Sequence, residues 1–274
     1  MTRAWTAALG AALAALAGLA VRALWIEPRR IRVHRRTLRL PHWPAELDGL
    51  RVALVGDVHA GSAHVTPQRV ARAARALARR RPDLLLLAGD LMDGDQDVPA
   101  EPFAHALAST GLPRAAVLGN HDRAYGGGRV ARALTAAGFR LLENAAWPVR
   151  LRGTDLHVVG VSDDTTGDAD PGHAFDGVRE GAPVLVLTHS PDAFPRIPAR
   201  AALTVAGHTH GGQVAVPRLR ARVIPSRHGE RYAEGHVVEG GRHLFVTTGV
   251  GTSRWPIRLG AQAEVVLLRL RSGG

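Results

Sequence analysis

The chain has 274 residues, enough to form one large domain or two small ones with a substantial core. It contains no cysteine, which excludes disulfides, zinc sites built on thiolates and cysteine nucleophiles, so a bound metal would be held by histidine, carboxylate, amide oxygen or water. The formal charge of +11 comes from arginine without any lysine, and an arginine cluster lies beside an apolar N-terminal segment. We therefore expect contact with a membrane surface and no specific nucleic-acid partner.

The N-terminal segment is the first predicted element. Residues 4–21 are uncharged and apolar, and the apolar run resumes after Arg22 as far as Ile26. Because roughly 20 apolar residues cross the core of a bilayer, the sequence predicts a single-pass anchor in the cell membrane through residues 4–26. A cleaved signal peptide is the alternative, since small-residue triplets such as 15–17 are present. More arginines follow the segment than precede it, which favours the cytoplasmic side for the rest of the chain.

Short apolar runs that end in polar clusters make up much of the remaining chain. Ile31 to Leu40 reads as a first strand because its apolar and polar residues partly alternate. The later runs are too short for helices and are bounded by Gly or Pro, so each predicts a buried strand followed by a loop. These runs cover residues 51–59, 83–94, 114–122, 182–192 and 201–212.

Helical segments are predicted between these strands. Pro67 and Pro82 bound a helix with an apolar stripe, and residues 97–110 and 127–137 are further helices. Strands that alternate with helices predict an α/β domain, in which ligands bind beyond the carboxyl ends of the strands. Strand-like pieces predominate from Trp147 onward, so we expect a second sheet. We divide the chain into an anchor or signal segment, 1–28, and one globular domain, 29–274.

Residues that commonly bind metals follow most of the predicted strands. Two pairs have alternate spacing, so in extended geometry both members of each pair would point to one side. Because buried carboxylates and imidazoles are costly without partners, we expect the whole set to converge on one centre. Two aspartates, one amide and four histidines exceed what one tetrahedral ion needs, and they suit two divalent ions, Mn, Fe or Zn, bridged by a carboxylate. The set is Asp57, His59, Asp90, Asn120, His189, His208 and His210.

The ordered blocks "DVH", "GDLMD", "GNHD", "TH" and "GHTH" resemble the signature of the calcineurin-like metallophosphoesterases. This resemblance, over about residues 31–270, implies a four-layer αββα sandwich with the site at one end of the paired sheets. It also implies the role of each ligand. Asp90 would bridge the two ions, Asp57, His59 and His210 would hold the first, and Asn120, His189 and His208 would hold the second.

The same resemblance gives His121 a catalytic role beside the metals. There it would protonate the leaving oxygen or stabilise the transferred phosphoryl group, and Asp122 would orient its ring. The attacking group would be a metal-bound hydroxide, because two cations lower the pKa of bound water to near neutrality.

Flanking motifs, including "THSPDAF" and "TTGVGTSRWPIRLG", are similar to the membrane-anchored branch of this family, which includes phosphodiesterases similar to UDP-2,3-diacylglucosamine pyrophosphatases. We therefore expect a membrane-associated enzyme that cleaves a phosphodiester or pyrophosphate bond of a lipid-linked or nucleotide-sugar-lipid substrate. Two alternatives are a phosphodiesterase for soluble nucleotides or nucleic acid, and a catalytically idle metal-binding scaffold. A phosphoprotein substrate is disfavoured, because Gly94 follows Asp93 directly and Asp122 stands where that branch has Glu.

Several further residues have weaker predicted roles. Asp93 either supports the bridge region through hydrogen bonds or is a turn residue. The acidic stretch 163–172 is expected to be a solvated loop rather than a calcium site, because it lacks the closing Glu of an EF-hand. His64 lies on the first site loop and is the strongest of the other histidines. Candidates for phosphate contacts are Arg123, Arg254 and Arg258.

Overall fold

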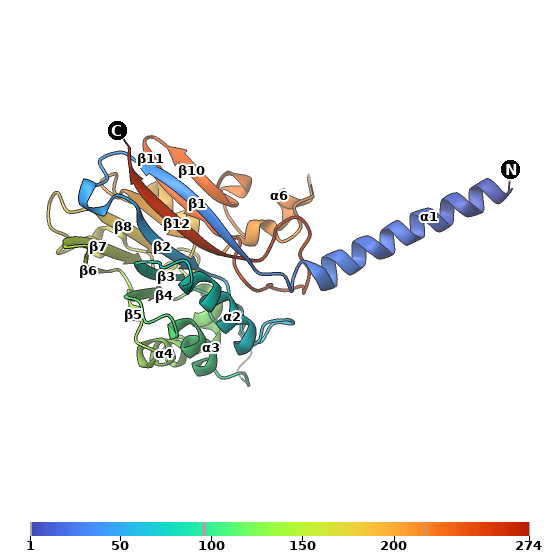
Figure 1. Cartoon of the computed structure of the whole chain (residues 1–274), viewed down its shortest axis with the longest axis horizontal. Coiled ribbons are helices and arrows are strands. Elements are labelled where there is room, and N and C mark those ends of the chain that lie inside the picture. Colours follow the sequence, from blue (N-terminus) through green and yellow to red (C-terminus); the bar gives the residue numbers. More distant parts are fainter. Residues whose placement is uncertain (1, 95–96, 217, 274) are drawn as a thin grey trace.

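The computed structural model describes residues 2–94, 97–216 and 218–273, and its body is built on two six-stranded sheets (Figure 1). The first sheet has the order β1 (Arg32–Leu40), β12 (Glu264–Ser272), β2 (Leu50–Val55), β3 (Leu84–Ala88), β4 (Arg114–Val117) and β5 (Arg140–Leu141). The second has the order β10 (Gly235–Glu239), β11 (Arg242–Val246), β9 (Leu203–Ala206), β8 (Val184–Thr188), β7 (Thr154–Val161) and β6 (Ala145–Leu151). Strands β2 to β5 pair in parallel, as do β7, β8, β9 and β11, so the loops after these strands emerge at common edges.

The two sheets pack through a shared apolar core. Leu54 and Leu86 of the first sheet and Leu187 and Phe245 of the second are almost fully buried in it. These strands read as nearly continuous apolar runs because they are covered on both faces.

Helical layers cover the outer faces. On the first sheet lie α2 (Pro67–Ala78), α3 (Glu101–Ala108) and α4 (Asn120–Ala136), and the second is covered by shorter pieces, α5 (Pro171–Ala174), η3 (Pro191–Arg196) and η5 (Gly229–Tyr232). The remaining short helices are η2 (Ala45–Leu47), η4 (His210–Gly212) and α6 (Arg220–Val223). The predicted α/β architecture, a four-layer αββα sandwich, is thus confirmed, although its second helical layer is thin.

The prediction for the helix over residues 127–137 was wrong at its start. Helix α4 begins at Asn120 and bends at Gly126, whose φ of 114° is not helical. The three consecutive glycines 126–128 weaken the helical pattern, which hides the first turn in the sequence. The correction places Asn120 and His121 on the first turn of a helix instead of in a loop.

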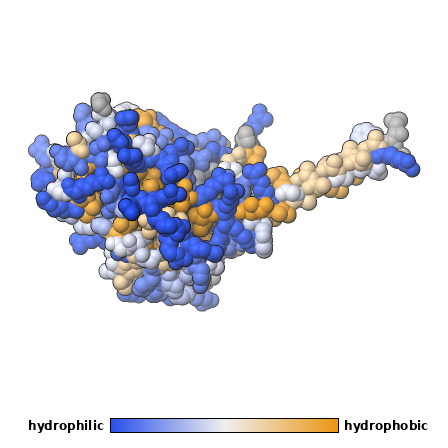
Figure 2. Space-filling model, in the orientation of Figure 1, coloured by the Kyte–Doolittle hydropathy of each residue, from blue (hydrophilic) through white to orange (hydrophobic). Residues whose placement is uncertain are grey.

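An N-terminal helix projects away from the sandwich (Figure 1). Helix α1 (Thr2–Val21) continues into a π-helical turn, η1 (Arg22–Ile26), and the span from Arg3 to Ile26 is long and apolar enough to cross a membrane. Its large apolar side chains are exposed, and Figure 2 shows apolar surface along the projecting helix. The end of the helix is fixed to the domain: the Arg258 N–H donates to the Ala23 carbonyl (3.0 Å), and the Gly260 N–H donates to the Glu27 carboxylate (2.7 Å).

Candidate metal centre

The loops that follow five buried strands bring all seven predicted ligands to one end of the sandwich. Asp57 and His59 follow β2, Asp90 follows β3, and Asn120 follows β4. In the second sheet, His189 follows β8, and the H-x-H turn with His208 and His210 follows β9. Apart from Asn120, which is partly exposed, all are buried.

The backbone at five of these residues is left-handed. The φ angles are 49° at Asp57, 49° at His59, 50° at Asp90, 72° at His208 and 52° at His210. A non-glycine residue in this region costs roughly 1–3 kcal/mol and persists only where its surroundings enforce it. Such a concentration is typical of a functional site, because these conformations turn successive side chains inward at the end of a strand.

The centre also requires close approach between backbone and carboxylates. A Cβ added at Gly119 would lie 2.1 Å from Asp90 Oδ1, and one added at Gly207 would lie 2.4 Å from Asp57 Oδ2. Neither distance can be accommodated without movement of the carboxylate. The glycines in "GNHD" and "GHTH" are therefore part of the site's construction.

We expect the Gly119→Ala variant to lose roughly 1–3 kcal/mol of unfolding free energy, because the new methyl group displaces Asp90 in a packed interior. A control lies in the helix that follows Gly119: a Cβ at Gly128 of α4 would meet Arg132 Nη1 at 3.6 Å, an ordinary contact distance. The Gly128→Ala variant should match or exceed the wild type, because alanine favours the helix by up to about 1 kcal/mol. Thermal unfolding of both variants checks this, and equal stability of the two would contradict the crowding argument.

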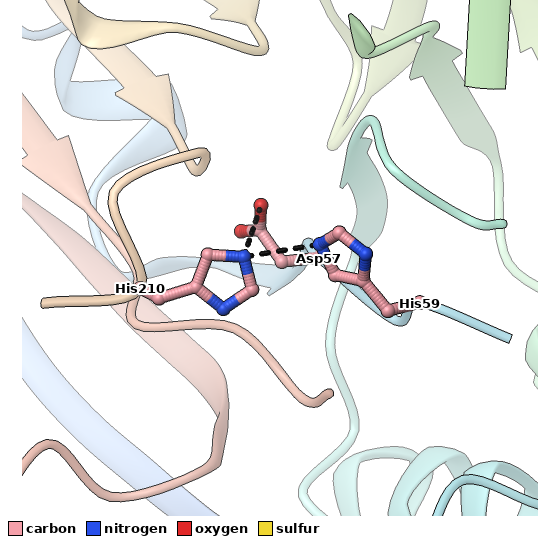
Figure 3. Close-up of side chains that lie close together, drawn as sticks. All are labelled: Asp57, His59 and His210. Atoms are coloured by element: carbon pink, nitrogen blue, oxygen red, sulfur yellow. Dashed lines mark hydrogen bonds and ion pairs between the residues drawn. The ribbon is translucent and has the colours of Figure 1, made fainter. Parts of the chain in front are cut away.

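Asp57, His59 and His210 form the first cluster (Figure 3), with one possible ligand atom from each lying within 4.8 Å of the others. The two histidines face each other with Nε2 atoms 3.0 Å apart, and His210 Nε2 lies 3.6 Å from Asp57 Oδ1. Asp57 Oδ2 is buried and has no hydrogen-bond partner among the described residues. Burial raises the pKa of Asp57 to about 6. A carboxylate oxygen without a partner beside two converging imidazole nitrogens fits a divalent cation.

Asp90, His189 and His208 form the second cluster, again within 4.8 Å of one another. His189 Nε2 lies 3.1 Å from His208 Nδ1 and 3.0 Å from Asn120 Oδ1, so the predicted amide ligand belongs to the same cluster. The other ring nitrogen of His189, Nδ1, is 2.8 Å from the Ala88 carbonyl, which leaves Nε2 directed at the site.

The Asp90 carboxylate lies between the two clusters. Its Oδ2 atom is 3.5 Å from His59 Nε2 in the first and 3.3 Å from His189 Nε2 in the second. Burial alone would raise the pKa of Asp90, but the charges of His189 and His59 and a hydrogen bond from His189 lower it overall. This position fits the predicted bridging ligand.

The four imidazoles respond differently to burial. Burial lowers the pKa of His208 to about 4, and burial together with the charge of His59 lowers that of His210 well below its usual value. Burial also acts to lower the pKa of His59 and His189, but in both the neighbouring carboxylates outweigh it and raise the pKa. Burial therefore favours the neutral forms of His208 and His210, the form in which imidazole binds metals.

Asp93 has a supporting position behind the first cluster. Its Oδ1 atom lies 2.7 Å from His59 Nδ1 and thereby holds the opposite nitrogen, Nε2, toward the site. A carboxylate that holds a metal-binding imidazole in this way fixes its orientation and raises its basicity. This geometry favours the supporting role over that of a simple turn residue.

We expect Asp93→Ala to weaken metal affinity roughly 10- to 100-fold, because His59 loses its orienting carboxylate. The exposed pair His173–Asp176, with Nδ1 and Oδ2 3.0 Å apart, provides a control of the same chemistry. Mn²⁺ titration by calorimetry should show the loss in Asp93→Ala and none in Asp176→Ala. Equal Mn²⁺ affinities in the two variants would contradict the supporting role of Asp93.

Asp122 does not have the position that was predicted for it. Instead of orienting the His121 ring, its carboxylate accepts the backbone N–H groups of Gly119 (3.1 Å) and Met92 (3.0 Å) and caps helix α4. Burial raises the pKa of Asp122 to about 7. The His121 ring is instead near Asp93, with Nδ1 3.5 Å from Oδ1, and its Nε2 lies 3.4 Å from Ser253 Oγ. Its ring is partly exposed at the edge of the site.

Comparison with known proteins decides the family. Residues 50–212 match the family model of the calcineurin-like phosphoesterases, and this range includes all seven predicted ligands. The chain belongs to the calcineurin-like phosphoesterase family. It is therefore a metal-dependent hydrolase of phosphoester bonds, as the sequence motifs predicted.

Three relatives show how far the similarity extends. The phosphoesterase is 33% identical to the phosphodiesterase YaeI of Escherichia coli, over 70% of this chain and 71% of that protein. It is 27% identical to an uncharacterized metallophosphoesterase, YkuE, of Bacillus subtilis, over 91% of this chain and 89% of that protein. It is also 27% identical to the UDP-2,3-diacylglucosamine pyrophosphatase LpxG of Chlamydia trachomatis, over 96% of each chain.

The clusters open into a pocket of about 440 Å³, in which Asp90, Asn120, His121 and the H-x-H turn form the floor. The walls of this phosphoesterase's pocket combine apolar side chains with polar and charged ones. The apolar side chains are those of Val214, Val223, Ile224, Trp255 and Ile257, and the polar ones are those of Gln213, Arg222, Ser253 and Arg254. A polar floor beneath partly apolar walls suits an amphiphilic ligand, whose charged group would reach the floor while its apolar part covers the apolar side chains of the walls.

The three arginines predicted to contact phosphate have different positions relative to the pocket. Arg254 lines the pocket and is exposed. Arg123 is paired with Glu143 and Asp168, and Arg258 is fully buried, where it donates to the carbonyls of the loop around Gly251. Neither Arg123 nor Arg258 lines the pocket.

Sequence reasoning missed Arg222, which also lines the pocket. It lies in a segment without a repeating pattern, and in a chain so rich in arginine no local signal distinguishes it.

The remaining predicted residues lie outside the two clusters. His64 packs edge-on against Trp25 at the end of the N-terminal helix, with ring centroids 6.4 Å apart. In the acidic stretch 163–172, Asp164 pairs with Arg196 and Arg227, and Asp170 caps helix α5 by accepting the His173 N–H. Both carboxylates therefore have protein partners.

Proposed function

We propose that this phosphoesterase is a membrane-anchored, dinuclear-metal phosphodiesterase or pyrophosphatase whose substrate is a lipid-linked phosphate, in the class of nucleotide-sugar lipids. The observation that carries the proposal is the pocket, which joins two buried ligand clusters to partly apolar walls beside a helix long enough to cross a membrane. The similarity to a UDP-2,3-diacylglucosamine pyrophosphatase over nearly the whole chain supports the substrate class. Residues 1–28 would form the anchor and residues 29–274 the catalytic domain on the cytoplasmic side.

Each residue at the centre has a proposed role. Asp57, His59 and His210 would hold one divalent ion, Asn120, His189 and His208 the other, and Asp90 would contact both. When bound, the two ions supply Lewis acidity, which neutralises charge on the phosphoryl group and eases deprotonation of the attacking water. The metal would be Mn, Fe or Zn, since this ligand set accepts each of them.

His121 would act on the leaving group. Its Nε2 atom is at the edge of the pocket, 3.4 Å from Ser253 Oγ, while its Nδ1 lies beside Asp93. From there it would donate a proton to the leaving oxygen as the bond to phosphorus breaks. Arg222 and Arg254, which line the pocket, would bind the charged group on the other side of the cleaved bond.

We propose that the N-terminal segment stays attached as an anchor and is not cleaved as a signal peptide. Cleavage after residue 17 would remove most of α1 and leave the following turn, which the hydrogen bonds of Ala23 and Glu27 attach to the domain. Mass spectrometry of the mature protein tests this point. Retention of the first 21 residues is expected, and a new N-terminus within them would contradict the anchor.

The substrate class is tested by hydrolysis with the Mn²⁺-loaded full chain in detergent. Two substrates form a matched pair: UDP-2,3-diacylglucosamine, and UDP-glucosamine, which has the same pyrophosphate without acyl chains. Burying even four methylenes against the apolar side chains of the walls contributes about 3 kcal/mol, so we expect kcat/KM roughly 100-fold higher for the acylated substrate. Equal values, or a preference for soluble nucleotides, would support the alternative of a soluble-substrate phosphodiesterase. No hydrolysis of any phosphoester would indicate an idle scaffold.

A further inference from the structure

Exposed apolar side chains gather at the mouth of the pocket. Beyond Ile26, five large apolar side chains are exposed among the described residues, and four of them belong to two neighbouring segments, one of which includes α6. We call these four the lip: Val216, Leu219, Val223 and Trp255, which are 40%, 45%, 46% and 69% exposed. The fifth, Val238, lies on strand β10. An exposed apolar group of this kind marks an interaction surface.

The lip is continuous with the pocket. Val223 and Trp255 line the pocket wall and also contribute to the exposed surface. Gln213 joins the two segments, because its side-chain amide donates to the Ser253 carbonyl (3.0 Å) and its side-chain carbonyl accepts the Ser253 N–H (2.7 Å). Whatever covers the lip therefore lies at the pocket entrance.

The lip also lies on the side of the domain from which the N-terminal helix projects. Trp255 is three residues before Arg258, whose N–H donates to the Ala23 carbonyl at the end of that helix. Three residues span roughly 10 Å, so the lip and the helix end are held close together. Figure 1 shows α6 on the α1 side of the sandwich, and Figure 2 shows apolar surface where the helix meets the body.

The charges around the lip select one occupant. Arg218, Arg222 and Arg254 are exposed beside it, and within the described parts of the chain none of these guanidinium groups pairs with a carboxylate. Arginine beside short apolar side chains and an exposed tryptophan is the composition of segments that bind the headgroup region of anionic bilayers. The neighbouring N-terminal helix, which is long and apolar enough to cross a membrane, favours a bilayer over a protein partner as the occupant.

We propose that the lip inserts into the surface of the same bilayer that holds α1, so that the pocket opens directly onto the membrane and a lipid substrate enters without leaving the leaflet. This inference rests on the membrane anchorage of the proposed function. It adds a second point of membrane contact to that made by α1. If α1 were the sole contact, the domain could rotate and the pocket could face the solvent.

The absence of native cysteine allows a direct test with single labels. The full-length variants Leu219→Cys and Val238→Cys would each carry an environment-sensitive fluorophore and be reconstituted in vesicles of phosphatidylcholine with a quarter phosphatidylglycerol. We expect blue-shifted emission and quenching by nitroxide lipids at position 219 and neither at 238. A label at 219 that stays in water would overturn the proposal. Equal shielding of this label in detergent at high protein concentration would also overturn it, because it would show a contact between protein molecules.

A second experiment measures the consequence for catalysis. Leu219 does not line the pocket, so Leu219→Glu leaves the pocket lining unchanged, and Val238→Glu is its control. The quantity measured for each variant is the turnover on the acylated pyrophosphate in vesicles divided by the turnover on soluble bis(p-nitrophenyl) phosphate. We expect the ratio to fall roughly tenfold or more for position 219, because a carboxylate opposes insertion into an anionic surface, and to stay at the wild-type value for 238. An unchanged ratio at 219 would contradict the proposal.

The two proposals can fail separately. If the label at 219 enters the bilayer but the wild type does not cleave the acylated substrate, the lip is retained and the proposed substrate is wrong. If the wild type cleaves that substrate while the label stays in water, the proposed function is retained and the docking surface is wrong.

Discussion

Replacement of Asp90 by asparagine is expected to lower turnover about a thousandfold and to reduce the bound metal below two ions per chain. Asp90 is the carboxylate within 3.5 Å of imidazole nitrogens from both clusters, and an amide in its place removes the negative charge shared between two cations. A contribution of about 4 kcal/mol from that charge corresponds to this factor in rate. Turnover of bis(p-nitrophenyl) phosphate and elemental analysis of the same sample provide the measurement.

The control for Asp90→Asn is Asp176→Asn, which changes an exposed carboxylate in the same way. The control should keep wild-type turnover and metal content. If Asp90→Asn kept two ions and lost less than tenfold in turnover, Asp90 would not be the bridge.

Replacement of His121 by alanine has the second large expected effect. We expect kcat to fall roughly 10²- to 10⁴-fold, because the leaving oxygen loses its proton donor, while metal content stays close to that of the wild type. The centre of the His121 ring is 4.7 Å from that of His59, and these two histidines and Asp93 form a third, less buried group of possible ligands at the edge of the pocket. Steady-state kinetics and elemental analysis together separate a proton donor from a ligand.

The exposed His173 serves as the control for this variant, since its ring pairs with Asp176 on the surface. His173→Ala should leave kcat unchanged. Loss of metal in His121→Ala would make His121 a ligand. The loss of kcat in His121→Ala should be smaller for a substrate with an activated leaving group, such as p-nitrophenolate, because this group needs less protonation. An equal loss of kcat for substrates with good and poor leaving groups would contradict the assigned role.

The convergence of the candidate ligands could be predicted from sequence because of the way parallel strands are arranged. Each ligand lies within a few residues of the end of an apolar run, and the ends of neighbouring parallel strands meet at one edge. The D-x-H and H-x-H spacing indicated convergence correctly, but the structure achieves it through left-handed turns rather than extended backbone.

Other features could not be read from local sequence. Asp122 follows His121 directly, yet adjacent residues in a helix point in different directions, so its carboxylate reaches the Gly119 N–H at the helix start and the Met92 N–H. That argument needed the start of α4, which the glycines at 126–128 concealed. Likewise, the buried position of Arg258 depends on carbonyls contributed by several residues of a long loop, and no repeating pattern marks such a loop.

Diffraction from crystals grown with Mn²⁺, recorded near the manganese absorption edge, tests the central claim most directly. We expect two anomalous peaks per chain, ~3.5–4 Å apart, one among Asp57, His59 and His210 and the other among Asn120, His189 and His208, with Asp90 in contact with both. A single peak, or peaks outside this end of the sandwich, would contradict the dinuclear centre on which the proposed chemistry depends.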